Sequence, residues 1–174
     1  MAFKPNFVRK KKRKQHGATF WEAEYNNPTH LKLSINPSED LEKFTRWVLR
    51  NKRDDVLSPS GKVLDVGCGN GRNLIYLANH FGNPGTGFDI SKSAIAQAMT
   101  ASKGLKITYK ARSIAGPLEL EDESQILVLD MMTSHFLNKE ERAELRDEIY
   151  RVLKPGGYLF MKTLLKDEDI HTAR

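Results

Sequence analysis

Apolar residues recur along this chain with two spacings, one typical of helices and the other of buried strands. Helical spacing, with apolar residues three and four positions apart, occurs at residues 41–48 and 74–81. Short apolar runs, typical of strands covered on both faces, occur at residues 62–66 and 126–129. The pattern therefore predicts that helices and strands alternate.

Start and stop signals place the remaining elements. Ser38, Ser91 and Asn138 stand where helix N-caps are expected, and Glu141 completes a capping-box pattern with Asn138. The segment "KPGG" ends the helix that follows Asn138. Further strands are expected at residues 86–90, 105–109 and 158–163. Helices between apolar strands require crossover connections, so the predicted fold is α/β with a mostly parallel sheet.

The positive charge of the chain is concentrated at its N-terminus. The net charge is +6, and residues 1–17 contain seven Lys or Arg and no acidic residue, whereas the rest contains 21 basic and 22 acidic residues. Six consecutive cations repel one another, which predicts a disordered basic arm at 1–17. The arm is either a solvated tail or a contact for the phosphates of RNA or DNA. A helical cap at 18–60 and a ligand-binding domain at 61–174 are expected to follow.

Hydropathy and cysteine content exclude several classes of protein. No apolar run approaches the ~18 to 20 residues that span a bilayer, and no apolar segment follows the basic arm as in a secretory signal. We therefore expect a cytoplasmic protein without a membrane partner. The single cysteine, Cys68, cannot form an internal disulfide and leaves too few thiols for a cysteine-built metal site.

The segment "KVLDVGCGNGR" places Gly67, Gly69 and Gly71 directly after a predicted strand. In a doubly wound sheet this loop is where the backbone approaches a ligand, and glycines permit that approach. Arg72 stands where a dinucleotide fingerprint needs its third glycine, and the Gly-Lys-Ser/Thr of a P-loop is missing. Asp89 ends the next strand, where a carboxylate can accept hydrogen bonds from a ribose. The pattern predicts a site for an adenine nucleoside without a required pyrophosphate.

Four segments in this order, "VLDVGCGNG", "GFDIS", "ILVLD" and "YRVLKPGGYLF", resemble the class I S-adenosylmethionine-dependent methyltransferases. The resemblance covers about residues 62–165. It implies a three-layer Rossmann-like fold of seven strands with a reversed final hairpin. It also implies enzymatic methyl transfer from S-adenosylmethionine to an acceptor.

The resemblance further implies which residues bind the cofactor. The segment from Asp65 to Gly71 is expected to cradle the methionine part, Asp89 to hold the ribose, and Asp130 with the residues after it to border cofactor and substrate. The predicted cofactor-binding residues are Asp65, Gly67, Cys68, Gly69, Gly71, Asp89, Ile90, Ser113, Asp130 and Met131.

The chain departs from the family pattern at two places. In the family, an acidic residue after the third strand commonly contacts the amino group of the adenine. This chain has Arg112 and Ser113 there, and backbone atoms near Ser113 are expected to replace the acidic residue in that contact. The chain also stops at Arg174, shortly after the fifth strand, where the family continues with a helix and two strands. We therefore expect a fold truncated after the fifth strand, with that strand as an apolar edge.

Methyl transfer needs alignment and, for some acceptors, removal of a proton. The segment "DMMTSHFL" supplies the catalytic candidates Asp130 and His135, and His135 has the unperturbed pKa of a general base near neutrality. A packing or capping role for His135 is the alternative. Trp21 and Tyr25, four residues apart, share one face of a predicted helix that either closes over the cofactor or packs against the sheet.

The predicted function is S-adenosylmethionine-dependent methylation of an acceptor that is a small molecule or an RNA. One alternative is an RNA ribose 2′-O-methyltransferase, because Asp130 and Lys162 stand at places comparable to two members of that group's Lys-Asp-Lys-Glu tetrad. The other alternative is a non-catalytic module that keeps the cofactor fold.

Deleting residues 1–15 is expected to reduce any affinity for RNA and to flatten its salt dependence without changing cofactor binding. Each phosphate that the arm contacts contributes about 0.7 to 0.9 to the log–log salt slope. RNA binding measured over a salt series, with and without the arm, tests this; equal slopes would make the arm a solvated tail.

Overall fold

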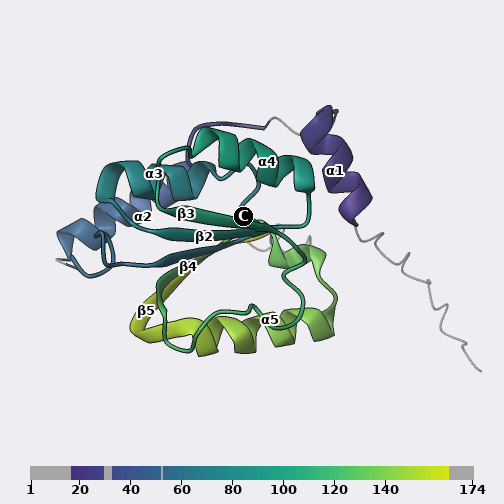
Figure 1. Cartoon of the computed structure of the whole chain (residues 1–174). Helices are drawn as coiled ribbons and strands as arrows, with labels where there is room; N and C mark the ends of the chain where they lie inside the picture. Colours follow the sequence, from purple (N-terminus) through teal and green to yellow (C-terminus); the bar gives the residue numbers. More distant parts are fainter. Residues whose placement is uncertain (1–16, 30–32, 52, 165–174) are drawn as a thin grey trace, which may run out of the picture.

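A computed structural model of the chain describes residues 17–29, 33–51 and 53–164 (Figure 1). The predicted basic arm lies outside these residues, apart from Gly17.

A five-stranded sheet forms the centre of the fold. Its strands are β1 (Val63–Val66), β2 (Gly85–Asp89), β3 (Ile107–Ala111), β4 (Gln125–Met131) and β5 (Leu153–Lys162). The strand order is β3-β2-β1-β4-β5, and every neighbouring pair is parallel. The predicted α/β fold with a parallel sheet is confirmed, and all carboxyl ends meet at one edge.

Helices cover both faces of the sheet (Figure 1). On one face lie α2 (Glu39–Arg50), α3 (Arg72–Phe81) and α4 (Lys92–Ala101), whose apolar residues join Val63, Leu127 and Leu129 in one core cluster. On the other face, α5 (Lys139–Val152) packs against Leu64, Val66 and Val128. The nine-residue helix α1 (Ala18–Asn26) lies outside these layers beside α4.

The helix caps follow the sequence signals. The Ser91 hydroxyl accepts the N–H of Ala94 at 3.1 Å at the start of α4. Asn138 and Glu141 form a reciprocal capping box at the start of α5. Ser38 is the N-cap residue of α2, but its side chain makes no capping hydrogen bond.

Two strand boundaries differ from the prediction. β3 begins at Ile107, two residues later than expected, because Leu105 still belongs to the turn after α4 and donates its N–H to Ser102. β5 begins at Leu153, but its pairing with β4 is interrupted between Leu153 and Tyr158, where the "KPGG" residues stand. From Tyr158 onward the register is continuous, as predicted. β5 lies at the edge of the described sheet.

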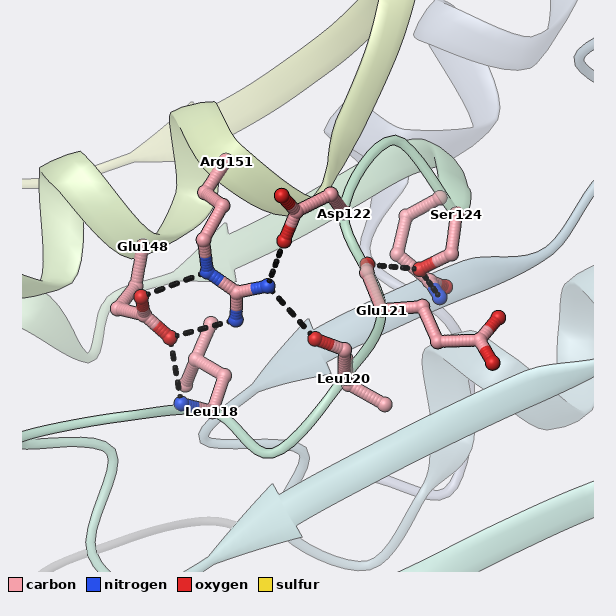
Figure 2. A network of polar contacts seen from close by, with 8 residues as sticks. Leu118, Leu120, Glu121, Asp122, Ser124, Glu148 and Arg151 are labelled. Atoms are coloured by element: carbon pink, nitrogen blue, oxygen red, sulfur yellow. Dashed lines mark hydrogen bonds and ion pairs between the residues drawn. The ribbon is translucent and has the colours of Figure 1, made fainter.

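A polar network fastens the connection between β3 and β4 to α5 (Figure 2). Arg151 makes a bidentate pair with Glu148, with both N···O distances at 2.8 Å, and donates to the Leu120 carbonyl at 2.7 Å. Glu148 also accepts the N–H of the fully buried Leu118 at 2.7 Å. Arg151 lowers the pKa of Glu148 to about 2 through these hydrogen bonds. The network therefore holds the far end of a connection that begins, at residues 112–114, beside the carboxyl edge of the sheet.

Replacing Glu148 with Ala is expected to destabilise the fold by about 1 to 3 kcal/mol, because the buried Leu118 N–H and the Arg151 guanidinium each lose an acceptor. Urea unfolding measures the change. Asp147→Ala, which removes the exposed ion pair of Asp147 with Arg146, is the matched control and should cost less than about 1 kcal/mol. Equal losses in the two variants would contradict a fastening role for Glu148.

Candidate functional site

In the loop between β1 and α3, every second residue is a glycine in the left-handed backbone region. Gly67, Gly69 and Gly71 have φ of 82°, 55° and 77°. A side chain is strained at such φ values, which accounts for glycine at all three positions. Space is a second reason, because a Cβ at Gly67 would overlap Thr133 and one at Gly69 would overlap the hydroxyl of Tyr25. Side chains of the protein itself therefore approach this backbone.

Asp89 connects the glycine loop to the next strand. Its carboxylate accepts the N–H of Gly69 at 2.8 Å and that of Ser91 at 2.9 Å. Burial raises the pKa of Asp89, and the backbone hydrogen bonds partly oppose this shift. An ionised carboxylate has about four lone-pair positions, so acceptor capacity remains for a ligand hydroxyl.

Asp65 lies near the end of β1, directly before the glycine loop, and Asp130 lies near the end of the neighbouring strand β4. Both residues are fully buried. Asp130 Oδ1 accepts the N–H groups of Thr133 and Ser134 at 3.2 and 3.1 Å, which shapes the loop after β4. Burial raises the pKa of Asp65 to about 8, with the charges of Asp89 and Asp130 acting in the same direction. The ionisation of Asp65 is thus disfavoured both by burial and by the two neighbouring carboxyl groups.

A cavity of about 400 Å³ opens beside these residues, within the size range of small-molecule sites. Its floor is the glycine loop with Asp89, and the loops after β3 and β4 form two walls. Helix α1 and the following segment contribute Trp21, Tyr25, Leu33 and Ser34. The remaining lining residues are Asn70, Arg72, Asn73, Ile90, Arg112, Ser113, Ile114, Met131, Met132, Thr133, Phe136 and Leu137.

Most of the predicted cofactor-binding residues meet at this cavity. Those that line it are Gly67, Cys68, Gly69, Asp89, Ile90, Ser113 and Met131. Gly71, Asp65 and Asp130 do not line it; Asp65 and Asp130 are fully buried behind it.

The two predicted catalytic side chains are not brought to the cavity. His135 lies in the short 3-10 helix Ser134–Phe136, whose Phe136 lines the cavity while His135 does not. Asp130 is directed to the backbone of its own loop. The catalytic roles of these two residues stay predictions.

Several lining residues were not predicted as site residues. Trp21 and Tyr25 share a face of α1, as their spacing predicts, and that face covers the cavity instead of packing on the sheet. Arg112 lines the wall after β3, with its guanidinium 5.1 Å from the centre of the Phe88 ring. Arg112 could have been predicted at the cavity from its position directly after the third strand. No local pattern in the sequence indicates that Leu33 or Phe136 lines the cavity.

The cavity offers a ligand one buried carboxylate and the backbone of the glycine loop. In the part of the chain that the structure describes, no group of three or more His, Cys, Asp or Glu side chains could hold a metal ion. The buried Asp89 carboxylate beside a bare glycine backbone fits a ribose with a polar substituent.

Among the helices that the structure describes, none has the length and apolar character of a membrane span.

The fold is Rossmann-like, and its cavity lies at the carboxyl edge of the sheet, where proteins of this fold class bind their ligands. A family model described as a methyltransferase domain matches residues 63–157, which is more than half of the chain. The chain belongs to this methyltransferase family.

Two curated relatives are similar to this chain, and one of them is named as a methyltransferase. An "uncharacterized protein" of Haemophilus influenzae is 35% identical over 120 residues, covering 67% of this chain and 47% of the relative. Phthiotriol/phenolphthiotriol dimycocerosates methyltransferase 1 of Mycobacterium ulcerans is 30% identical over 155 residues, covering 86% of this chain and 54% of the relative. The chain thus spans about half the length of these curated relatives.

A solved structure supports the fold. The crystal structure of geranyl diphosphate C-methyltransferase from Streptomyces coelicolor, a complex with Mg2+, geranyl diphosphate and S-adenosyl-L-homocysteine, has a TM-score of 0.60. The sequence identity is 17%, and the similarity covers 84% of this chain and 62% of that one. At this identity the similarity establishes the fold only.

Replacing Asp65 with Asn is expected to stabilise the protein increasingly as the pH rises from about 4 to about 8. Over this range folded Asp65 keeps a proton that the unfolded chain releases, so its contribution to the wild-type stability falls as the pH rises. Each unit of pKa difference corresponds to about 1.4 kcal/mol. Thermal melts at pH 5 and pH 8, with Asp147→Asn as an exposed control, measure the effect; a parallel pH dependence in wild type and variant would contradict it.

Proposed function

We propose that this chain is the cofactor-binding part of a methyltransferase that uses S-adenosylmethionine. The observation that carries the proposal is the Asp89 carboxylate, which reaches the cavity while holding the glycine loop by the Gly69 N–H. Family membership supports the same cofactor, as does the S-adenosyl-L-homocysteine in the Streptomyces coelicolor structure.

In this proposal each wall of the cavity takes one part of the cofactor. The free lone pairs of Asp89 accept the ribose hydroxyls, and Ser113 with Ile114 and Arg112 borders the base. The glycine loop receives the methionine part at the N-terminus of α3. The bound cofactor supplies an electrophilic methyl group on a sulfonium. The protein has to align the acceptor with that methyl group and keep water away.

We propose a small, largely apolar acceptor in preference to an RNA. The apolar or aromatic residues that line the cavity include Trp21, Leu33, Met131, Met132, Phe136 and Leu137. Such an enclosed surface favours burial of an apolar molecule over contact with a polyanion. The relative from Mycobacterium ulcerans carries phthiotriol and phenolphthiotriol dimycocerosates in its name.

The arrangement of Lys162 also disfavours the ribose 2′-O-methyltransferase alternative. Its ammonium group is hydrogen-bonded to Asp40 of α2, whereas Asp130 Oδ1 accepts two backbone N–H groups of its own loop. The two members of the suggested tetrad are therefore not paired with each other. RNA binding through the N-terminal arm and a cytoplasmic location stay predictions of the sequence.

Replacing Asp89 with Ala is expected to weaken the binding of S-adenosylhomocysteine strongly. Each lost hydrogen bond to the carboxylate costs about 1.5 to 3 kcal/mol, so loss of a ribose contact lowers the affinity by about ten-fold or more. Isothermal titration calorimetry of wild type and variant measures this, with a ligand-free thermal melt to follow the fold. A folded Asp89→Ala protein with wild-type affinity would remove Asp89 from the site, and a wild type that binds no S-adenosylhomocysteine would overturn the proposed function.

A further inference from the structure

One carboxylate, that of Glu22, makes three hydrogen bonds between helix α1 and the start of α4. Glu22 Oε2 accepts the hydroxyl of Ser91 at 2.8 Å and the N–H of Ser93 at 3.2 Å. Its other oxygen accepts the hydroxyl of Ser93 at 2.5 Å. The first turn of a helix carries unsatisfied N–H groups and a positive partial charge, so it is a favourable place for a carboxylate. Glu22 therefore docks α1 on the N-terminus of α4.

Other contacts fix the direction in which α1 lies. Gln97 of α4 donates its side-chain N–H to the carbonyl oxygen of Tyr25 at 2.7 Å. On the opposite side of the cavity, the ring of Trp21 packs edge-to-face on Phe136, with 5.0 Å between ring centres. The helix thus bridges the cavity, from α4 to the loop after β4, and presents Trp21 and Tyr25 to its interior.

The docking contact is also joined to the ribose-binding carboxylate. Ser91 donates its hydroxyl to Glu22, accepts the Ala94 N–H with the same oxygen, and donates its own N–H to Asp89. Groups that share a hydrogen-bond network respond to one another's removal. A change at Glu22 is therefore transmitted to the floor of the cavity as well as to its cover.

We propose that Glu22 is the positioning residue of the site, which holds α1 over the cavity and thereby retains the bound cofactor. The proposal rests on the proposed function, since it assumes that the cavity binds S-adenosylmethionine. The Glu22 side chain does not line the cavity, so it acts through Trp21, Tyr25 and Ser91. Hydrogen bonds from Ser93 and Ser91 lower the pKa of Glu22 to about 2, so the docking group is charged at neutral pH.

Helix α1 could have the opposite effect and block the cavity, and the experiment distinguishes this from retention of the ligand. The Tyr25 hydroxyl lies so close to Gly69 that a Cβ there would overlap it, so it covers part of the backbone that the methionine end is expected to approach. If α1 were a plug, loosening it would strengthen binding. If α1 retains the ligand, loosening it weakens binding, chiefly by faster dissociation.

The chain contains two tryptophans, Trp21 and Trp47, so a Trp47→Phe background leaves Trp21 as the single fluorescent reporter of α1. In this background Glu22→Ala is expected to shift the Trp21 emission to the red and to increase its quenching by acrylamide without any ligand. Glu144→Ala, which removes an exposed glutamate of α5, is the matched control and should leave both signals unchanged. Unchanged fluorescence in Glu22→Ala would overturn the docking role of Glu22.

Binding of S-adenosylhomocysteine supplies the second measurement. Glu22→Ala should lower the affinity by about ten-fold or more, with a faster dissociation rate in stopped-flow experiments. Ser93→Ala changes the other side of the contact and should act in the same direction, while the double variant should lose less than the two single losses combined. Wild-type or tighter binding in Glu22→Ala would overturn the proposal, and tighter binding would identify α1 as a plug. A wild type that fails to bind refutes the proposed function instead, and the ligand-free fluorescence still decides whether Glu22 docks α1.

Discussion

The site depends on one hydrogen bond, from the N–H of Gly69 to the carboxylate of Asp89. The N–H groups of Gly67 and Cys68 bond to the Phe88 carbonyl of β2, and that of Gly71 bonds to the Cys68 carbonyl. The N–H of Gly69, between them, is bonded to a side chain instead, and a buried N–H needs such an acceptor. Asp89 supplies that acceptor from the neighbouring strand, and its second oxygen accepts the N–H of Ser91 at the start of α4. A single buried carboxylate thereby fixes two of the connections at the carboxyl edge of the sheet.

Burying three carboxyl groups at this edge of the sheet has an electrostatic cost, and the hydrogen bonds that offset it differ among the three groups. Asp65, Asp89 and Asp130 stand near the ends of three adjacent strands and are all buried, and the charges of Asp89 and Asp130 raise the free energy of ionising Asp65. Asp89 and Asp130 each accept two backbone N–H groups, whereas Asp65 has only the nearby Arg72 and Asn73 side chains to lower its pKa. Perturbed carboxyl groups of this kind concentrate at functional sites, because a preorganised polar site is not optimised for stability.

The features that sequence reasoning predicted correctly are those with a local signal. Strand and helix periodicity, the caps at Ser91 and Asn138 and the glycine loop all depend on neighbouring residues, and the structure reproduces them. Side-chain direction was not predictable in the same way. Asp130 stands at the expected strand end, but it turns to the N–H groups three and four residues ahead, which the spacing of residues does not encode. The pair of Lys162 with Asp40 spans 122 residues, so no pattern along the chain indicates it.

The cavity of the proposed enzyme is lined from two parts of the sequence. The match to the methyltransferase domain begins at residue 63 and includes the glycine loop, Asp89 and the loop after β4. Trp21, Tyr25, Leu33 and Ser34 line the same cavity from outside that match. The proposed acceptor surface combines both parts, because Phe136 and Leu137 lie inside the match and Trp21 and Leu33 lie outside it. In this chain the cover is α1, and its position over the cavity is set by a contact between Glu22 and serines 69 and 71 residues further along the chain.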